Sequence, residues 1–201
     1  YQELEQLARI VSGGGGVCSV HIREARGLSK GVEEAEQLGR ETGASALVNH
    51  LMPIEGKEAE YQETLTRLAA LPKESNFHFN ANPFTVSVLP LAAFLPAWAE
   101  KGTATETWEH VRDPWMKERI VKELPKVKPQ QFVIGRAAGN EALKGKTLKD
   151  FMELYSIRSV PAALMKLMEV TRLRALIFHE NINAKLISLG LAHPRSLIAS
   201  N

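Results

Sequence analysis

Short apolar runs rich in β-branched residues alternate with amphipathic stretches over the first part of the chain. The runs at 17–22, 44–50 and 77–80 each follow a segment whose apolar residues recur every three or four positions. This spacing predicts a helix before each run, and the runs themselves predict buried strands. Gly13 and Gly43 stand where the first two helices are expected to end. Helices and apolar strands in repeated alternation predict an α/β fold with a parallel sheet covered by helices.

The alternation is interrupted between residues 82 and 146. This stretch is rich in proline and contains all three tryptophans, so we interpret it as a helical insertion. Within it, Asp113 and Pro114 form an N-cap and first-turn pair that predicts the start of a helix. A second cap at Thr147 marks the return of regular elements, including expected strands at 175–178 and 197–200. The predicted organisation is β/α units over 1–81, an insertion over 82–146 and final β/α units over 147–201.

Composition narrows the function classes. The 201 residues include 25 basic and 23 acidic side chains, a formal charge of +2, and the basic residues are scattered along the chain. Charge therefore gives no support to a nucleic-acid partner. An apolar run of membrane-spanning length and an N-terminal signal pattern are both missing, so we expect a cytoplasmic protein without a membrane partner. A single cysteine, Cys18, excludes an internal disulfide and a cysteine-rich zinc site.

His21 and His50 are the strongest candidates for chemistry. Each lies at the carboxyl end of a predicted strand, where the loops of a parallel sheet converge on a ligand. Neighbouring strands are about 4.8 Å apart, so two imidazoles there can reach one metal ion. The alternative is that each histidine is only hydrogen-bonded at the rim of the sheet. Arg23 points to the same side as His21 and is a candidate for holding a substrate carboxylate, although Glu24 or Glu55 could pair with it instead.

Several segments of the chain resemble, in order and spacing, the N-acyl-D-amino-acid deacylases (D-aminoacylases) of the metal-dependent amidohydrolase superfamily. The matching segments are 21–24, 32–35 with 39–43, 48–51, 82–85, 95–98, 112–114, 145–148, 193–194 and 198–201. The resemblance spans nearly the whole chain and corresponds to the later strands of that family's barrel. It implies a partial (β/α)8 TIM barrel, about its second half, with the insertion flanking the entrance to the active site.

The resemblance also implies a chemistry. His21 and His50 would be zinc ligands, Cys18 would be an ordinary strand residue, and the substrate would be a small-molecule N-acyl amino acid whose amide bond is hydrolysed. Zinc with an open coordination position lowers the pKa of bound water to near 7 and so supplies hydroxide for attack on the carbonyl.

This sequence departs from the family pattern at several positions. The family's catalytic aspartate falls at Asn201, whose amide cannot act as a general acid or base, so no catalytic residue is assigned. Met52 stands where many relatives have lysine, and Asn82 where they have tyrosine. A closed barrel takes about 250 residues, and an open half leaves sheet edges that invite pairing with another chain. Either an upstream half completes the barrel in the native protein, or this chain is a degenerate remnant that forms a homo-oligomer through its open edges or remains poorly stable.

Two functions therefore remain open, beside a third and less favoured interpretation, an unrelated α/β binding domain whose histidines are rim residues and whose resemblance to the family is chance. The first is a fragment of a zinc-dependent amidohydrolase, inactive as an isolated chain and completed by ligands from an upstream half. The second is a non-catalytic, degenerate amidohydrolase-like scaffold used for binding or assembly. The histidine pair favours the first function, and Asn201, Met52 and Asn82 favour the second.

Overall fold

The chain folds into two compact units in the computed structural model, which describes residues 1–22 and 27–199. Unit 1 comprises Tyr1–Thr85 and Ile182–Asn201, and unit 2 comprises Val86–Asn181. Unit 2 is thus inserted into the sequence of unit 1. None of the described helices is both long and apolar enough to span a bilayer.

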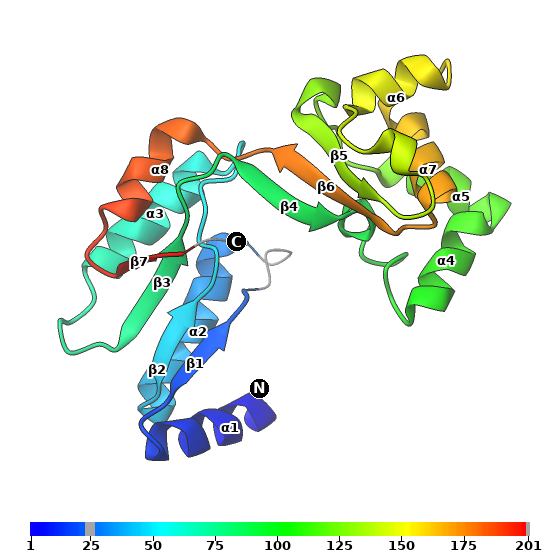
Figure 1. Cartoon of the computed structure of the whole chain (residues 1–201). Helices are drawn as coiled ribbons and strands as arrows, with labels where there is room; N and C mark the ends of the chain where they lie inside the picture. Colours follow the sequence, from blue (N-terminus) through cyan, green and yellow to red (C-terminus); the bar gives the residue numbers. More distant parts are fainter. Residues whose placement is uncertain (23–26, 200–201) are drawn as a thin grey trace. The chain divides into compact units, whose positions relative to one another are not determined.

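Unit 1 contains a parallel sheet of four strands in the order β1-β2-β3-β7 (Figure 1). The strands are β1 (Val17–Val20), β2 (Ser45–Val48), β3 (Phe77–Ala81) and β7 (Ser196–Ile198). All three pairings are parallel, with Val20 opposite Val48 and Val48 opposite Phe79. The predicted parallel sheet is therefore confirmed for these four strands.

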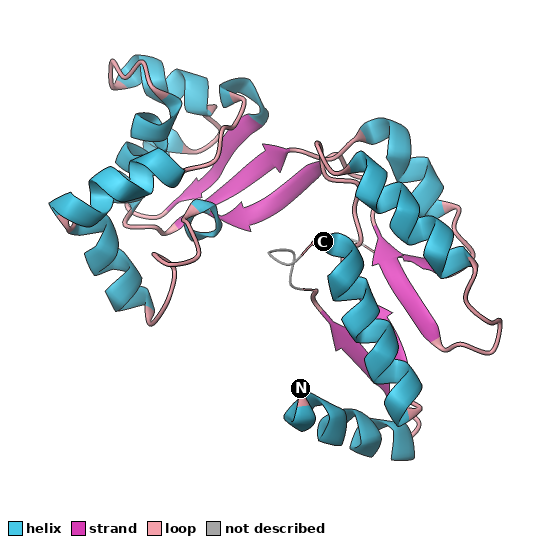
Figure 2. Cartoon of the chain, turned by 180° about the vertical axis from the view of Figure 1, so that it is seen from behind, coloured by secondary structure: helices cyan, strands magenta, loops and turns pink. Residues whose placement is uncertain are grey.

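One face of this sheet is covered by helices. The helices of unit 1 are α1 (Gln2–Gly13), α2 (Leu28–Thr42), α3 (Glu58–Ala69) and α8 (Ala184–Leu191), and Figure 2 shows helices lying in front of the strands. Val32, Tyr61 and Leu68 pack against Val48 and Phe79 in the core of the unit. Helix α2 ends as predicted, with Gly43 left-handed at φ 70°.

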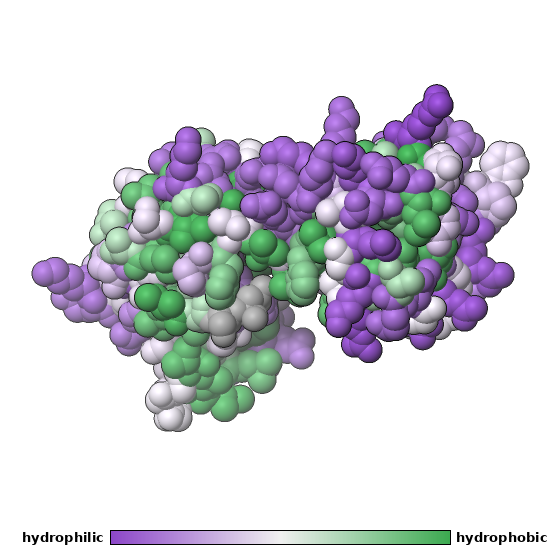
Figure 3. Space-filling view, turned by 45° about the horizontal axis from the view of Figure 1, so that its top comes forward, coloured by the Kyte–Doolittle hydropathy of each residue, from purple (hydrophilic) through white to green (hydrophobic). Residues whose placement is uncertain are grey.

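The opposite face of the sheet is much less covered. Burial alternates along β1 and β2: Ser19 is exposed and Leu47 is half-buried on this face. Their strand neighbours Cys18, Val20, Ala46 and Val48 are on the side that faces the helices. On β7, Leu197 and Ile198 are 48% and 74% exposed. Hydrophobic side chains accordingly reach the surface in several places in Figure 3. The two sheets formed by the described residues are open, and those residues form no closed barrel.

Unit 2 is built on an antiparallel sheet with the strand order β4-β6-β5. The strands are β4 (Val86–Pro90), β5 (Phe132–Ala137) and β6 (Ala175–Glu180). The α-helices are α4 (Ala104–Arg112), α5 (Pro114–Glu123), α6 (Leu148–Leu154) and α7 (Val160–Thr171). Short 3-10 helices span Leu91–Phe94, Pro129–Gln131 and Glu141–Leu143. One core combines the sheet with these helices, with Phe132, Ile134, Phe151, Leu164 and Ile177 at its centre.

The division differs from the prediction at both ends of the insertion. Residues 82–85 were predicted to belong to the insertion but lie in unit 1, and residues 147–181 were predicted to belong to the final β/α units but lie in unit 2. Strand β6 pairs antiparallel with both neighbours and alternates between buried and exposed residues. A run of four apolar residues does not reveal whether a strand pairs parallel or antiparallel, so the pattern alone could not make this assignment.

Both predicted caps are confirmed. The Asp113 carboxylate accepts hydrogen bonds from the backbone N–H groups of Trp115 and Met116, with Pro114 in the first turn of α5. Thr147 begins α6 with a reciprocal capping box formed with Asp150.

Candidate functional site

His21 and His50 lie side by side in unit 1, just beyond the carboxyl ends of β1 and β2. Their ring centroids are 5.1 Å apart and the ring planes are tilted by 34°. The structure thus brings together the two residues that the sequence singled out. At this separation a nitrogen of each ring can approach one ion at the roughly 2.0–2.1 Å typical of zinc.

The backbone of His50 adopts a conformation that is rare for a residue with a side chain. Its φ is 57°, in the left-handed region, which costs on the order of 1–3 kcal/mol and persists only when the surroundings hold it. The neighbouring N–H groups are anchored to adjacent strands, since Asn49 N donates to Val20 O at 2.8 Å and Leu51 N donates to Asn80 O at 3.0 Å.

A row of amide side chains crosses the ends of the same three strands. His50 N donates to Asn80 Oδ1 at 2.7 Å, and Asn80 Nδ2 donates to Asn49 Oδ1 at 2.6 Å. Asn49 Nδ2 in turn donates to Ser19 Oγ at 2.7 Å. Asn80, which is 8% exposed, was not among the candidate residues predicted from the sequence. The only signal was its place at the end of the third strand, level with the two histidines.

The environment of His50 favours its neutral form. Partial burial lowers the pKa of the His50 imidazole, and the charge on His21 lowers it further. Neutral imidazole is the form that ligates a metal.

The described residues supply two side chains at this place that could ligate a metal, His21 and His50. No group of three or more His, Cys, Asp or Glu side chains able to hold a metal occurs among residues 1–22 and 27–199. Cys18 packs against Ala8, Leu38 and Ala44 on the helix side of β1, so it behaves as an ordinary strand residue. Arg23 and Asn201 lie outside the described residues, as does Glu24.

Met52 and Asn82 are packed into unit 1. They are 7% and 5% exposed, and Asn82 N contacts Met52 Sδ at 3.5 Å. Asn82 Oδ1 accepts a hydrogen bond from Phe84 N at 3.0 Å, which stabilises the turn after β3. Both side chains therefore already have structural partners.

The loop between α3 and β3 is held by Arg195, which lies far along the chain and was not predicted from the sequence to have a role. The residue is 9% exposed, and among the described residues its guanidinium donates to backbone carbonyls alone. The acceptors are Leu68 O, Leu71 O, Pro72 O, Ser75 O and Phe77 O. His193 Nδ1 accepts from Arg195 N at 3.2 Å, while His193 Nε2 lies 3.1 Å from Leu65 O. His193 therefore has a structural role in unit 1.

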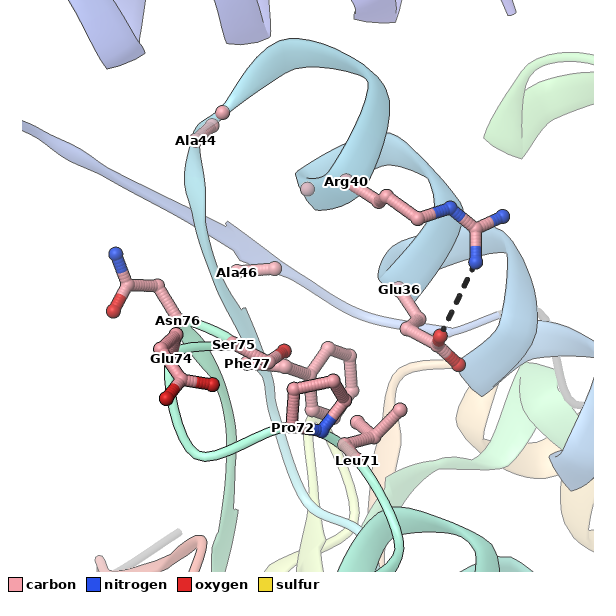
Figure 4. Close-up of a pocket in the computed structure, with 12 residues that line it drawn as sticks. Glu36, Arg40, Ala44, Ala46, Leu71, Pro72, Glu74, Ser75, Asn76 and Phe77 are labelled. Carbon is pink, nitrogen blue, oxygen red and sulfur yellow. Dashed lines mark ion pairs between the residues drawn. The ribbon is translucent and has the colours of Figure 1, made fainter.

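A pocket of about 600 Å³ lies at the opposite end of the strands from the histidines. Its lining includes Ala44 and Phe77, which mark the beginnings of β2 and β3, and the loop held by Arg195 (Figure 4). Glu36 and Arg40 form an ion pair at its edge, with 3.6 Å between Oε1 and Nη1. Ligands of parallel α/β sheets bind at the carboxyl ends of the strands, so this pocket is separate from the candidate site.

A smaller hollow of about 260 Å³ adjoins His21 itself. Ile22, Ala35 and Leu38 contribute apolar surface to it, together with Tyr1. The candidate site thus combines two imidazoles, a row of amides and an apolar recess within unit 1.

Comparison with known proteins relates this chain to a group of metalloenzyme structures. No family model matches the sequence, and no curated protein matches it. Among solved structures, D-aminoacylase, described as defining a subset of amidohydrolases, aligns over 100% of this chain with a TM-score of 0.66 and 16% identity. N-acyl-D-glutamate deacylase from Bordetella bronchiseptica, solved with zinc and a phosphonate inhibitor, aligns over 98% with a TM-score of 0.65 and 16% identity.

A further D-aminoacylase structure, which concerns a binuclear metal centre, aligns equally well. The chain spans 35% of the length of each of these proteins. The resemblance that the sequence motifs indicated is therefore confirmed in three dimensions: the chain has the mixed α/β fold of about a third of the D-aminoacylase and N-acyl-D-glutamate deacylase structures of the amidohydrolase group.

Proposed function

We propose that this chain forms part of a metal-dependent amidohydrolase that hydrolyses the amide bond of N-acyl amino acids, with His21 and His50 as two ligands of a zinc ion. In this proposal the four parallel strands are about half of a TIM barrel. The observation that carries it is the approach of two imidazoles, 5.1 Å between centroids, at the carboxyl ends of adjacent parallel strands.

The two donors present, the imidazoles of His21 and His50, fit zinc. Two neutral imidazoles suit zinc, and the lowered pKa of His50 keeps its nitrogen free of a proton near neutral pH. A tetrahedral ion needs further ligands, which in this proposal come from water and from protein segments beyond the described residues. When bound, zinc supplies a nucleophilic hydroxide and polarises the scissile carbonyl.

The chain's own residues orient and shelter the reactants. Asn49 and Asn80 fix the end of β2 from which His50 projects. The apolar hollow beside His21 offers a surface for the acyl part of a substrate, since Ile22, Ala35 and Leu38 exclude water there. Arg23, two positions beyond His21, remains our candidate for the substrate carboxylate.

A second candidate is a non-catalytic scaffold with this fold. It is favoured by the packed side chains of Met52 and Asn82 and by the limit of two ligands among the described residues. In either case association with another chain, such as a second copy, is favoured by the exposed apolar residues of β7 and by the outer edges of β1 and β7, which pair with no other strand of the described residues.

Zinc titration of the 201-residue chain separates the two candidates. We expect the wild type to bind zinc, and His21→Ala and His50→Ala each to weaken binding by more than the roughly 10–100-fold typical of outer-shell changes. His110→Ala is the matched control, because His110 lies in unit 2 and bonds to Ala99 O. Equal zinc affinity in the wild type and both site variants would reject the metal pair and leave the scaffold.

A further inference from the structure

The row of amides beside the histidine pair has a definite direction, which follows from the chemistry of its members. A backbone N–H can only donate, so Asn80 must present its oxygen to His50 N. The Asn80 amide group must then donate to Asn49 Oδ1, and the Asn49 amide group must donate to the Ser19 hydroxyl oxygen. Each orientation is fixed by the preceding one, beginning at His50.

His50 depends on this row more than an ordinary strand-end residue would. Its left-handed backbone, φ 57°, directs the chain sharply out of β2, and a residue with a Cβ does not hold that conformation unaided. Asn80 contacts the turn twice, because its side-chain oxygen accepts from His50 N and its backbone oxygen accepts from Leu51 N.

We infer that Asn80 is a positioning residue: its carboxamide holds His50 in the left-handed conformation that places the His50 imidazole beside His21. The importance of Asn80 for metal binding rests on the proposed function, but its effect on the position of His50 can be tested without metal. Asn80 acts through the backbone of His50 and is not itself proposed as a ligand.

The chemistry of the row distinguishes substitutions of similar size. Asn80→Ala removes the acceptor and leaves His50 N without a partner. Asn80→Asp retains an oxygen that accepts from His50 N. The rest of the row can stay hydrogen-bonded, because the Asn49 amide can flip to donate to the new carboxylate and the Ser19 hydroxyl can rotate to donate to the Asn49 oxygen. Asn82→Ala is the matched control, since Asn82 is equally buried but caps its own turn at Phe84.

Nuclear magnetic resonance of the metal-free 201-residue chain gives the direct test. We expect ring-to-ring nuclear Overhauser contacts between His21 and His50, and slow hydrogen exchange at the His50 amide, in the wild type, Asn80→Asp and Asn82→Ala. In Asn80→Ala the ring contacts should disappear and exchange at that amide should accelerate about 10-fold or more. Unchanged contacts and exchange in Asn80→Ala would overturn the inference.

If Asn80→Ala does not fold, Asn49→Ala provides the test. It leaves the acceptor for His50 in place but removes the group that orients it, so the same ring contacts should weaken. Unchanged contacts in Asn49→Ala would then count against the inference.

Zinc titration of the same variants separates this inference from the proposed function. If both are correct, Asn80→Ala weakens zinc binding by about 10–100-fold and Asn80→Asp does not. If the wild type binds no zinc while the ring contacts depend on Asn80, the metal proposal fails and the positioning role stands. If zinc binds with the same affinity to wild type and Asn80→Ala, the positioning role fails and the metal proposal stands.

Discussion

Replacing Arg195 with methionine tests how unit 1 is held together. Methionine preserves much of the aliphatic volume but removes every donor, so the five carbonyls that now accept from the guanidinium lose that partner together. One of them, Leu68 O, belongs to the last turn of α3, where a positive charge is favourable.

The expected loss follows from the number and the burial of these bonds. A hydrogen bond to a charged group contributes about 1.5–3 kcal/mol, but the desolvation of a buried guanidinium offsets a large part of the sum of five. We expect Arg195→Met to lower the free energy of unfolding by about 3–5 kcal/mol, out of a total of about 5–15 kcal/mol for an ordinary domain. Arg195→Lys should cost about half as much, because a single ammonium has three donors at most.

Urea denaturation measures the effect on the stability of the whole unit. Hydrogen exchange of the native protein at Ser75 N, which donates to Pro72 O inside the loop, measures the local effect. Arg40→Met is the control: the Arg40 side chain is 70% exposed and its ion pair with Glu36 should contribute less than about 1 kcal/mol. The reasoning is refuted if Arg195→Met and Arg40→Met lose equal stability, or if Ser75 exchange is the same in both.

Three further predictions concern packing, pH and capping. Gly190→Ala should destabilise unit 1 by about 1–3 kcal/mol, because the new Cβ overlaps the Tyr61 hydroxyl. Thermal unfolding should show partial recovery of stability when Tyr61→Phe is added, because the Tyr61 hydroxyl has no hydrogen-bond partner among the described residues and its removal costs little. Burial lowers the pKa of His193 in the folded chain, so the unfolded chain binds more protons in acid and the free energy of unfolding should fall as the pH drops from 7.5 to 5.5. Chemical denaturation should show a smaller fall in His193→Gln, and the same pH dependence in wild type and variant would contradict this cause. Thr147→Ala should cost about 1 kcal/mol by loss of the α6 cap, and circular dichroism melting that matches wild type would contradict it.

Sequence pattern predicted much of unit 1. The four parallel strands and the adjacency of His21 and His50 follow from apolar runs, glycine stops and the rule that parallel strands end on one side. The left-handed backbone of His50 and its bond to Asn80 were not predicted, because side-chain amides that bond across strands leave no periodic trace in the sequence.

Unit 2 was harder to predict. Its caps at Asp113 and Thr147 were found because capping depends on residues only two or three positions apart. Strand β4 was not predicted, and β6 was predicted without its antiparallel partners, since pairing over long separations is decided by tertiary contacts. The role of Gly190 was not predicted either: it lies inside α8, where the lack of a side chain leaves room for the Tyr61 hydroxyl.

The chain leaves unit 1 after Thr85 and re-enters it at Ile182, and these two residues are joined by a hydrogen bond from Ile182 N to Thr85 O at 3.2 Å. The entropic cost of closing a loop grows only logarithmically with its length. The insertion of unit 2, whose two ends lie together, therefore adds little to the entropic cost of folding unit 1. During synthesis, however, β3 emerges from the ribosome long before β7 and Arg195 can reach it. Residues 86–181 of unit 2 are all synthesised before Arg195, so the α3–β3 loop stays without its anchor while they emerge.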